Sequence, residues 1–136
     1  MIAALQEYVV PVLRTKSFSG SFPHFRRCTD AAVHLLTFQF NRRGGSFVVE
    51  VASCSPEGIM THGGERILAM ELKATDVDPS LRLRLGATDK RPDHWFKFNG
   101  RFAWNRYVRA AKTVLPFLSS QAEEWWTRPQ ENERRG

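Results

Sequence analysis

Three neighbouring segments rich in β-branched and aromatic residues predict an antiparallel meander. They are FPHFRRC (Phe22–Cys28), AVHLLTFQF (Ala32–Phe40) and SFVVEVASC (Ser46–Cys54). Thr29-Asp30 separates the first two segments, and the polar run Asn41–Gly45 separates the second from the third. Both connections are too short for the crossover that parallel strands need, so we expect the three strands to pair antiparallel.

Helical periodicity marks both ends of the chain. Near the N-terminus, apolar residues recur at helical intervals: Ile2, Leu5, Tyr8, Val9, Val12 and Leu13. Pro11 lies within this stretch and predicts a kink or an early stop. A second stripe follows Gly100: Trp104, Tyr107, Val108, Ala111, Val114 or Leu115, and Leu118. We expect Pro116 to end that helix, and Ser120 with Glu123 to form a capping box that starts a last short helix through Trp126.

Two more strands are predicted between these helices. LRLRLG (Leu81–Gly86) alternates leucine with arginine, and HWFKFN (His94–Asn99) precedes an Asn99-Gly100 turn. Residues 55–79 are broken up by proline and glycine, and Glu65–Ala74 within them fits either a helix or a strand. A connection of this length is typical of a functional or a flexible loop.

These elements predict a single α+β domain over residues 1–128. Its antiparallel sheet has about five strands, with the N- and C-terminal helices packed mainly on one face. Residues 129–136 are polar, and we expect them to form a disordered tail.

The chain is basic, which favours anionic partners. Its 136 residues carry a net charge of +6, and its pI is about 9.9. The positive charges are spread along the chain, which is more typical of a solvated basic surface than of one dedicated polyanion site. The N-terminus has the wrong charge pattern for a signal peptide, no stretch is long enough to span a membrane, and two cysteines make no disulfide framework. We therefore expect a cytoplasmic protein with no membrane association and with buried, reduced thiols.

Pairing the strands assigns side chains to two faces. A turn at Thr29-Asp30 places Phe25 opposite His34, and a loop over residues 42–45 places Phe40 opposite Phe47. One face then collects Phe25, Leu36, Phe38, Phe40, Phe47, Val49 and Val51, and the helices are expected to cover it. His34 falls on this face, where a hydrogen-bonded core histidine is expected.

The opposite face collects the polar side chains, and we call it the polar face. Its members are His24, Arg26, Thr37, Gln39, Glu50, Arg82 and Arg84. Arginine guanidinium groups match the geometry of carboxylates and phosphates, so these residues are the candidate binding site. The alternative is a merely solvated face, as antiparallel sheets commonly have. A slip of one residue in register would reverse the two faces.

No motif predicts a particular reaction. The four histidines lack metal-ligand spacing, and His62-Gly63-Gly64 lacks the lysine and the strand–helix context of a phosphate loop. Neither cysteine lies in a context that would activate it as a nucleophile. We expect no metal and no cofactor.

The order of the motifs resembles a known family. A helix leads into a strand that ends in FRR, and LLTFQF, LRLRLG, DHWFKF and VLPFLSSQAEEWW follow. This set, from Leu5 to Trp126 without residues 55–79, resembles DUF4304, a family of small bacterial domains of unknown function. The resemblance implies an α+β domain and brings no activity, substrate or catalytic residue.

We expect a non-catalytic binding or protein-interaction module of the bacterial cytoplasm rather than an enzyme, with another protein or an anionic ligand on the polar face. Two alternatives stay open. One is nucleic-acid binding through the basic helix 105–112 and its surroundings, with Arg101, Arg106, Arg109 and Lys112 on the phosphates. The other is a small enzyme with His24 or Glu50 as an acid–base group in a cleft on the polar face.

Overall fold

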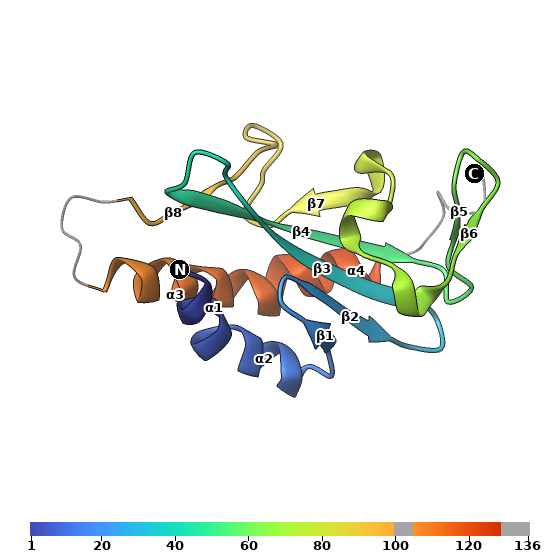
Figure 1. Ribbon diagram of the computed structural model, residues 1–136, viewed down its shortest axis with the longest axis horizontal. Helices are drawn as coiled ribbons and strands as arrows, with labels where there is room; N and C mark the ends of the chain where they lie inside the picture. The colour runs from blue at the N-terminus through green and yellow to red at the C-terminus, as the bar shows by residue number, and fades with distance from the viewer. Residues whose placement is uncertain (100–104, 129–136) are drawn as a thin grey trace.

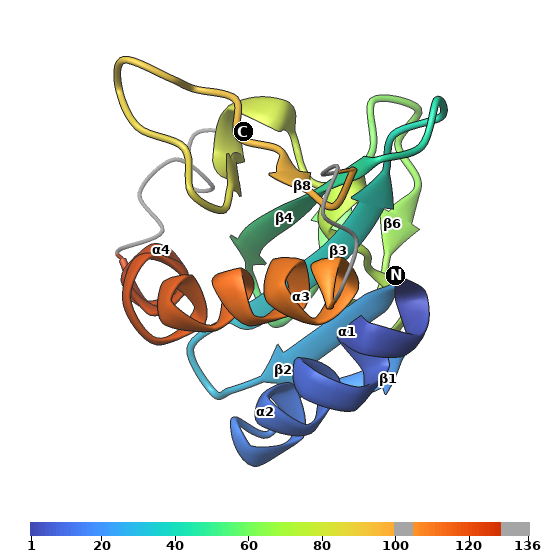
Figure 2. The ribbon, with the colours of Figure 1, turned by 90° about the vertical axis from the view of Figure 1, so that its left-hand side faces the viewer.

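An antiparallel sheet carries helices on one face and an irregular connection on the other (Figures 1 and 2). The computed structural model describes residues 1–99 and 105–128. Its helices are α1 (Ile2–Tyr8), α2 (Val10–Thr15), α3 (Arg106–Phe117) and α4 (Glu123–Thr127). The residues of three predictions lie outside the described part: Gly100 of the turn, Arg101 and Trp104 of the basic helix and its stripe, and the polar tail 129–136.

The main sheet confirms the predicted meander. Its strands are β1 (Ser19–Ser21), β2 (His24–Cys28), β3 (Val33–Phe40), β4 (Ser46–Cys54), β7 (Arg82–Arg84) and β8 (Phe96–Lys97). They are ordered β1-β2-β3-β4-β7, β8 also pairs with β4, and every pairing is antiparallel. The α+β fold is therefore as expected, and one further short strand, β1, is added at the edge of the meander beside β2.

The register of the second hairpin is as predicted, whereas that of the first was wrong by two residues. Phe40 opposes Phe47. Phe25, however, opposes Leu36, and Arg27 takes the place opposite His34. Thr29 causes the shift, because both its N–H and its hydroxyl bond to the Ala32 carbonyl and place the turn at Asp30-Ala31, one residue later than predicted. A displacement of two residues keeps each side chain on its predicted face.

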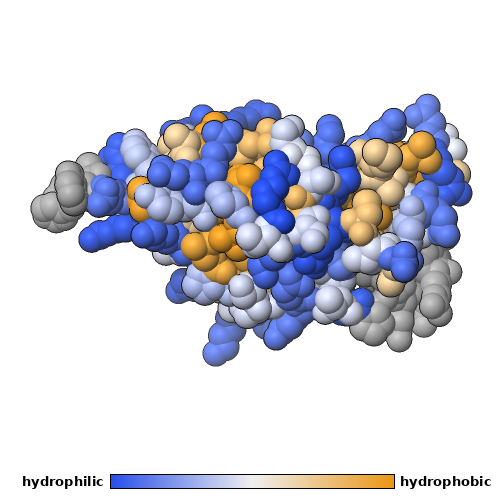
Figure 3. All heavy atoms as spheres, turned by 90° about the horizontal axis from the view of Figure 1, so that it is seen from below, coloured by the Kyte–Doolittle hydropathy of each residue, from blue (hydrophilic) through white to orange (hydrophobic). Residues whose placement is uncertain are grey.

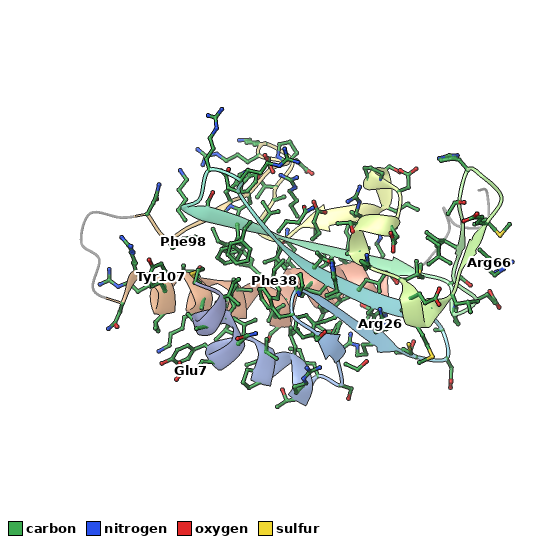
Figure 4. The ribbon with its side chains drawn as sticks, in the orientation of Figure 1. Glu7, Arg26, Phe38, Arg66, Phe98 and Tyr107 are labelled. Atoms are coloured by element: carbon green, nitrogen blue, oxygen red, sulfur yellow. The ribbon has the colours of Figure 1, made fainter. Side chains whose placement is uncertain are left out.

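The apolar face is covered by the helices, as expected. Phe38 and Phe47 pack with tilted rings, 6.3 Å apart, in a run of aromatic side chains between the sheet and the helices, where Figure 4 labels Phe38. Trp126, from α4, is 1% exposed and donates its indole N–H to the Leu35 carbonyl at 3.0 Å. On the outside, hydrophilic side chains cover most of the face seen from below, with separate orange areas between them (Figure 3).

The predicted break near Pro11 is present in the N-terminal helical stretch, whereas the predicted break near Pro116 is absent from the C-terminal one. The N-terminal stretch is interrupted at Val9, and Pro11 lies in the first turn of α2, where its missing N–H needs no helical partner. At the C-terminus, Pro116 lies inside α3 and does not end it. Ser120 is not a cap: it lies in a π-helical segment, Leu118–Ala122, and its hydroxyl bonds back to the Pro116 carbonyl. The chain therefore runs from α3 into α4 without the predicted break.

Residues 55–81 cover one end of the polar face. They form a two-stranded arm of β5 (Ile59–Met60) and β6 (Arg66–Ile67), then 3₁₀ turns at Ala69–Glu71, Ala74–Asp76 and Pro79–Leu81. Glu65–Ala74, for which one helix or one strand was considered, thus contains a short strand, β6, followed by 3₁₀ turns. Apolar residues from these turns make a second core on the sheet: Leu72, Ala74 and Val77 with Val33, Leu35, Ala52 and Cys54. Cys54 is buried, but Cys28 is exposed, contrary to expectation.

Candidate functional site

The polar face is arranged in two rows across the sheet. One row runs His24, Thr37, Glu50 and Arg84, and the other runs Arg26, Leu35, Ala52 and Arg82. The rows follow from antiparallel pairing, which places directly opposed residues on the same face. Gln39, which opposes Val48, lies on the same face two residues beyond Thr37. All seven predicted residues therefore share one face, but they do not form one site.

His24 and Arg26 lie under the irregular connection, away from the rest. Arg26 donates to the Leu72 carbonyl at 2.9 Å, and Figure 4 labels it on β2. His24 Nδ1 is 2.9 Å from the hydroxyl of Thr37, which is buried. Burial lowers the pKa of His24, and the nearby Lys73 lowers it further. These three residues attach the connection to the sheet, a structural role.

The other four predicted residues line a hollow of about 510 Å³, which we call the face hollow. Its lining is Gln39, Glu50, Pro79, Arg82, Arg84, Pro92 and Asp93. Strands β3, β4 and β7 supply the predicted members, and the loop after β7 supplies Pro92 and Asp93. Asp93 was missed because a loop of this length has no periodicity that would assign its side chains to a face.

Arg84 is held on three sides within this hollow. Its Nε donates to Glu50 Oε1 at 3.0 Å, and another of its nitrogens pairs with Asp93. Its guanidinium also lies 5.4 Å from the centre of the Trp95 ring. Burial alone would lower the pKa of Arg84, but the hydrogen bonds to Asp93 and Glu50 raise it. Arg84 is therefore a fixed ion pair that shapes the hollow.

Arg82 is the cation of the hollow that remains available. It makes no hydrogen bond or ion pair to a side chain of residues 1–99 or 105–128, and its Nε is buried without an acceptor there. Since a buried donor without an acceptor costs about 1–3 kcal/mol, an incoming anion that accepts from Arg82 gains that much. The hollow thus contains two carboxylates, Glu50 and Asp93, that are paired with Arg84, and one guanidinium, that of Arg82, that makes no ion pair with a described residue.

The acid–base candidates are occupied. Glu50 is nearly buried and bonded to Arg84, and Asp93 is bonded to Arg84 and to the Trp95 indole at 3.1 Å. His24 is absent from the lining of the face hollow. In the described part of the chain, no group of three His, Cys, Asp or Glu residues is placed to hold a metal.

The basic helix presents fewer free cations than its sequence suggested. Arg106 stacks on Tyr107 at 4.8 Å and bonds to its hydroxyl, and Lys112 lies 5.2 Å from the Tyr8 ring. Arg109 and Lys112 are exposed one turn apart on α3. Among the described helices, none is long and apolar enough to cross a membrane.

A family model matches residues 9–128, and its description is a domain of unknown function, DUF4304. The chain belongs to the DUF4304 family. The match covers all of the main sheet and both helices of the C-terminal stretch, including the strands that line the face hollow. No curated protein and no solved structure matches the chain.

Proposed function

We propose that this DUF4304 domain is a non-catalytic protein-interaction module that holds an anionic group of its partner on the polar face. The observation that carries the proposal is Arg82, a half-buried guanidinium at the wall of a hollow. It makes no hydrogen bond or ion pair with a carboxylate of the described residues, although its charge acts on the nearby Asp78 and lowers the pKa of that carboxyl. Arginine recognises carboxylates through paired, charge-assisted hydrogen bonds.

The rest of the hollow supports binding rather than a reaction. Its two carboxylates are bonded to Arg84, so neither is placed to take a proton from a ligand. Gln39 is exposed at the rim and brings an amide that donates and accepts. A fixed ion pair beside a free guanidinium orients an anion while leaving it chemically unchanged.

The test is capture of partners from the native host by the tagged full chain, with nuclease treatment and at two salt concentrations. We expect at least one protein that survives nuclease and is reduced about tenfold or more by Arg82→Gln, since a charge-assisted hydrogen bond contributes about 1.5–3 kcal/mol. Arg43→Gln is the matched control, because Arg43 lies in an exposed loop and the change removes the same charge.

Equal capture by the Arg82 and Arg43 variants would contradict the proposal. Recovery of nucleic acid alone, lost at high salt, would favour the exposed cations of α3 instead.

A further inference from the structure

A second hollow, of about 620 Å³, runs along the outer edge of β7, and we call it the edge groove. The strand supplies Arg82, Leu83 and Arg84, and the loop and the C-terminal helices supply the rest: Ala87, Thr88, Asp89, Pro92, Gln121, Glu124, Trp125 and Arg128. Because neighbouring residues of a strand point to opposite faces, this lining reaches around both sides of β7. Only β4 pairs with β7 among the described strands, so the groove follows a sheet edge.

The backbone of β7 presents two unused polar groups to this groove. Leu85 donates its N–H to the Val49 carbonyl at 2.8 Å, so by alternation the polar groups of Arg82 and Arg84 point away from β4. The Arg82 N–H bonds to Pro79, and the Arg84 carbonyl accepts from Ala87. The Arg82 carbonyl and the Arg84 N–H have no hydrogen bond to any described residue.

These two groups have the spacing that a parallel strand requires. In a parallel ladder, a residue of the added strand lies beside one residue of the existing strand. It donates its N–H to the carbonyl of the residue before that one, and its carbonyl accepts from the N–H of the residue after that one. Leu83 is that neighbour here, with the Arg82 carbonyl before it and the Arg84 N–H after it. Extended peptides commonly bind sheet edges in this way, with backbone bonds giving affinity and side-chain pockets giving specificity.

Side-chain donors without acceptors lie in the same groove. Arg82 Nε and Trp125 Nε1 are both buried, and neither has a hydrogen-bond partner in the described structure. Arg128 lies over the Trp125 ring at 3.3 Å and brings a second guanidinium to the lining. Asp89 and Glu124 also line the groove, so the complement to these donors is a ligand that supplies acceptors with a single negative charge placed on Arg82.

The wall opposite the strand is fixed. The Gln121 side chain accepts from the Gly86 N–H at 2.6 Å and donates to the Ala87 carbonyl at 2.7 Å, which ties the end of β7 to the C-terminal helices. Gly86 has a φ of +91°, and a Cβ there would lie 2.5 Å from the His94 ring, so the turn that opens the groove requires glycine. Little rearrangement is then needed for binding, which favours affinity.

We propose that the edge groove binds an extended peptide of a partner protein as an added parallel strand on β7, with an Asp or Glu side chain of the peptide on Arg82. The inference rests on the proposed function in one respect, since Arg82 lines both the face hollow and the edge groove. It adds the chemistry of the partner: a strand-forming segment with one acidic side chain.

The experiment selects random octapeptides displayed on phage against the tagged full chain and measures the best sequence as a synthetic peptide. We expect the selected peptides to share an acidic residue at one position and β-branched residues beside it. Amide chemical-shift changes are expected at residues 82–88 and 121–128. Arg82→Gln is expected to weaken binding about tenfold or more. Trp125→Phe, which keeps a ring but removes the N–H donor, is expected to weaken binding several-fold.

Backbone methylation of the peptide tests the added strand directly. N-methylation at successive positions is expected to abolish binding at the residue that donates to the Arg82 carbonyl and to leave its immediate neighbours bound. Arg43→Gln is the matched control for Arg82→Gln, since Arg43 is exposed in a loop and lines neither hollow. Gln39→Leu distinguishes the two hollows, since Gln39 lines the face hollow and is absent from the edge groove.

Three results would overturn the inference: no enriched peptide, equal binding by every methylated peptide, or loss with Gln39→Leu but not with Trp125→Phe. The last result would leave the polar face as the site while removing the groove. Sedimentation that shows a dimer through β7 would replace the peptide by a second copy of the chain. If binding to the host partner depends on Arg82 but not on Trp125, this inference has failed while the proposed function stands. If binding to the host partner does not depend on Arg82, the proposed function has failed as well.

Discussion

His34 shows how a single buried residue ties stability to pH. Its ring is 6% exposed, stacks on Trp126 at 6.0 Å and accepts from Arg27 Nε at 3.0 Å. Burial lowers its pKa to about 4, and the positive charge of Arg27 contributes in the same direction, against Glu123. His34 is therefore a neutral core histidine, as its place on the apolar face had suggested.

The pH dependence follows from that pKa. The unfolded chain binds a proton on His34 near pH 6.5, whereas the folded chain does so only near pH 4. Stability is therefore fully present above about pH 6.5, falls as the pH drops towards 4, and then levels off as far as this group is concerned. The expected loss is about 3 kcal/mol at most, from 1.36 kcal/mol for each pKa unit.

Urea denaturation of the wild type and His34→Gln between pH 4 and 7 measures this effect. Glutamine can still accept from Arg27 but does not titrate, so its curve is expected to be flatter over this interval. His62→Gln, in the exposed arm, is the control and is expected to follow the wild type. Parallel curves for His34→Gln and the wild type would contradict the assignment.

Among the elements, the irregular connection contributes a core of its own. Leu72 is 1% exposed and packs on the strands with Ala74 and Val77. Leu72→Ala is expected to lower the free energy of unfolding by about 2–5 kcal/mol, through lost burial and the cavity left behind. Met70→Ala, two residues away at 78% exposure, is the matched control, and we expect a change within about 0.5 kcal/mol.

Chemical denaturation of both variants measures the difference. Equal, small effects of the two changes would show that the connection does not pack on the sheet as the structure has it. A large effect of Leu72→Ala would establish that the second face is partly a core.

The sequence predicted the β3–β4 hairpin in detail because both strands alternate clearly and the loop length fixes the register. It missed the register of β2 because nothing in the string shows that Thr29 bonds to Ala32 through both its N–H and its hydroxyl. The sequence also did not predict that the irregular connection packs over Val33 and Leu35, since 3₁₀ turns have no repeating hydrophobic pattern that identifies their buried residues. Alternation along the strands predicted correctly that the seven site residues share a face. It could not predict that only four of them line the face hollow, because that depends on the paths of the loops.

For the molecule as a whole, the two cores are joined through the same strands. Phe38 and Val51 face the helices, while Leu35 and Ala52 on the same two strands face the connection. Because both cores are built on the same strands, unfolding of the sheet disrupts both of them together. We therefore expect residues 1–128 to unfold in one cooperative step. Single domains of this size usually do so.

Two probes of urea unfolding test this coupling. Tryptophan fluorescence reports on Trp126 in the helix-side core once Trp95, Trp104 and Trp125 are replaced by phenylalanine. A cysteine-reactive dye reports on Cys54 in the second core, measured in a Cys28→Ser background. The two transitions are expected to coincide, and Leu72→Ala is expected to shift both midpoints equally although Leu72 belongs to the second core. A dye transition at lower urea than the fluorescence transition would mean that the connection opens separately. The face hollow would then change shape below the global unfolding free energy, because Pro79 and Arg82 lie at the end of that connection.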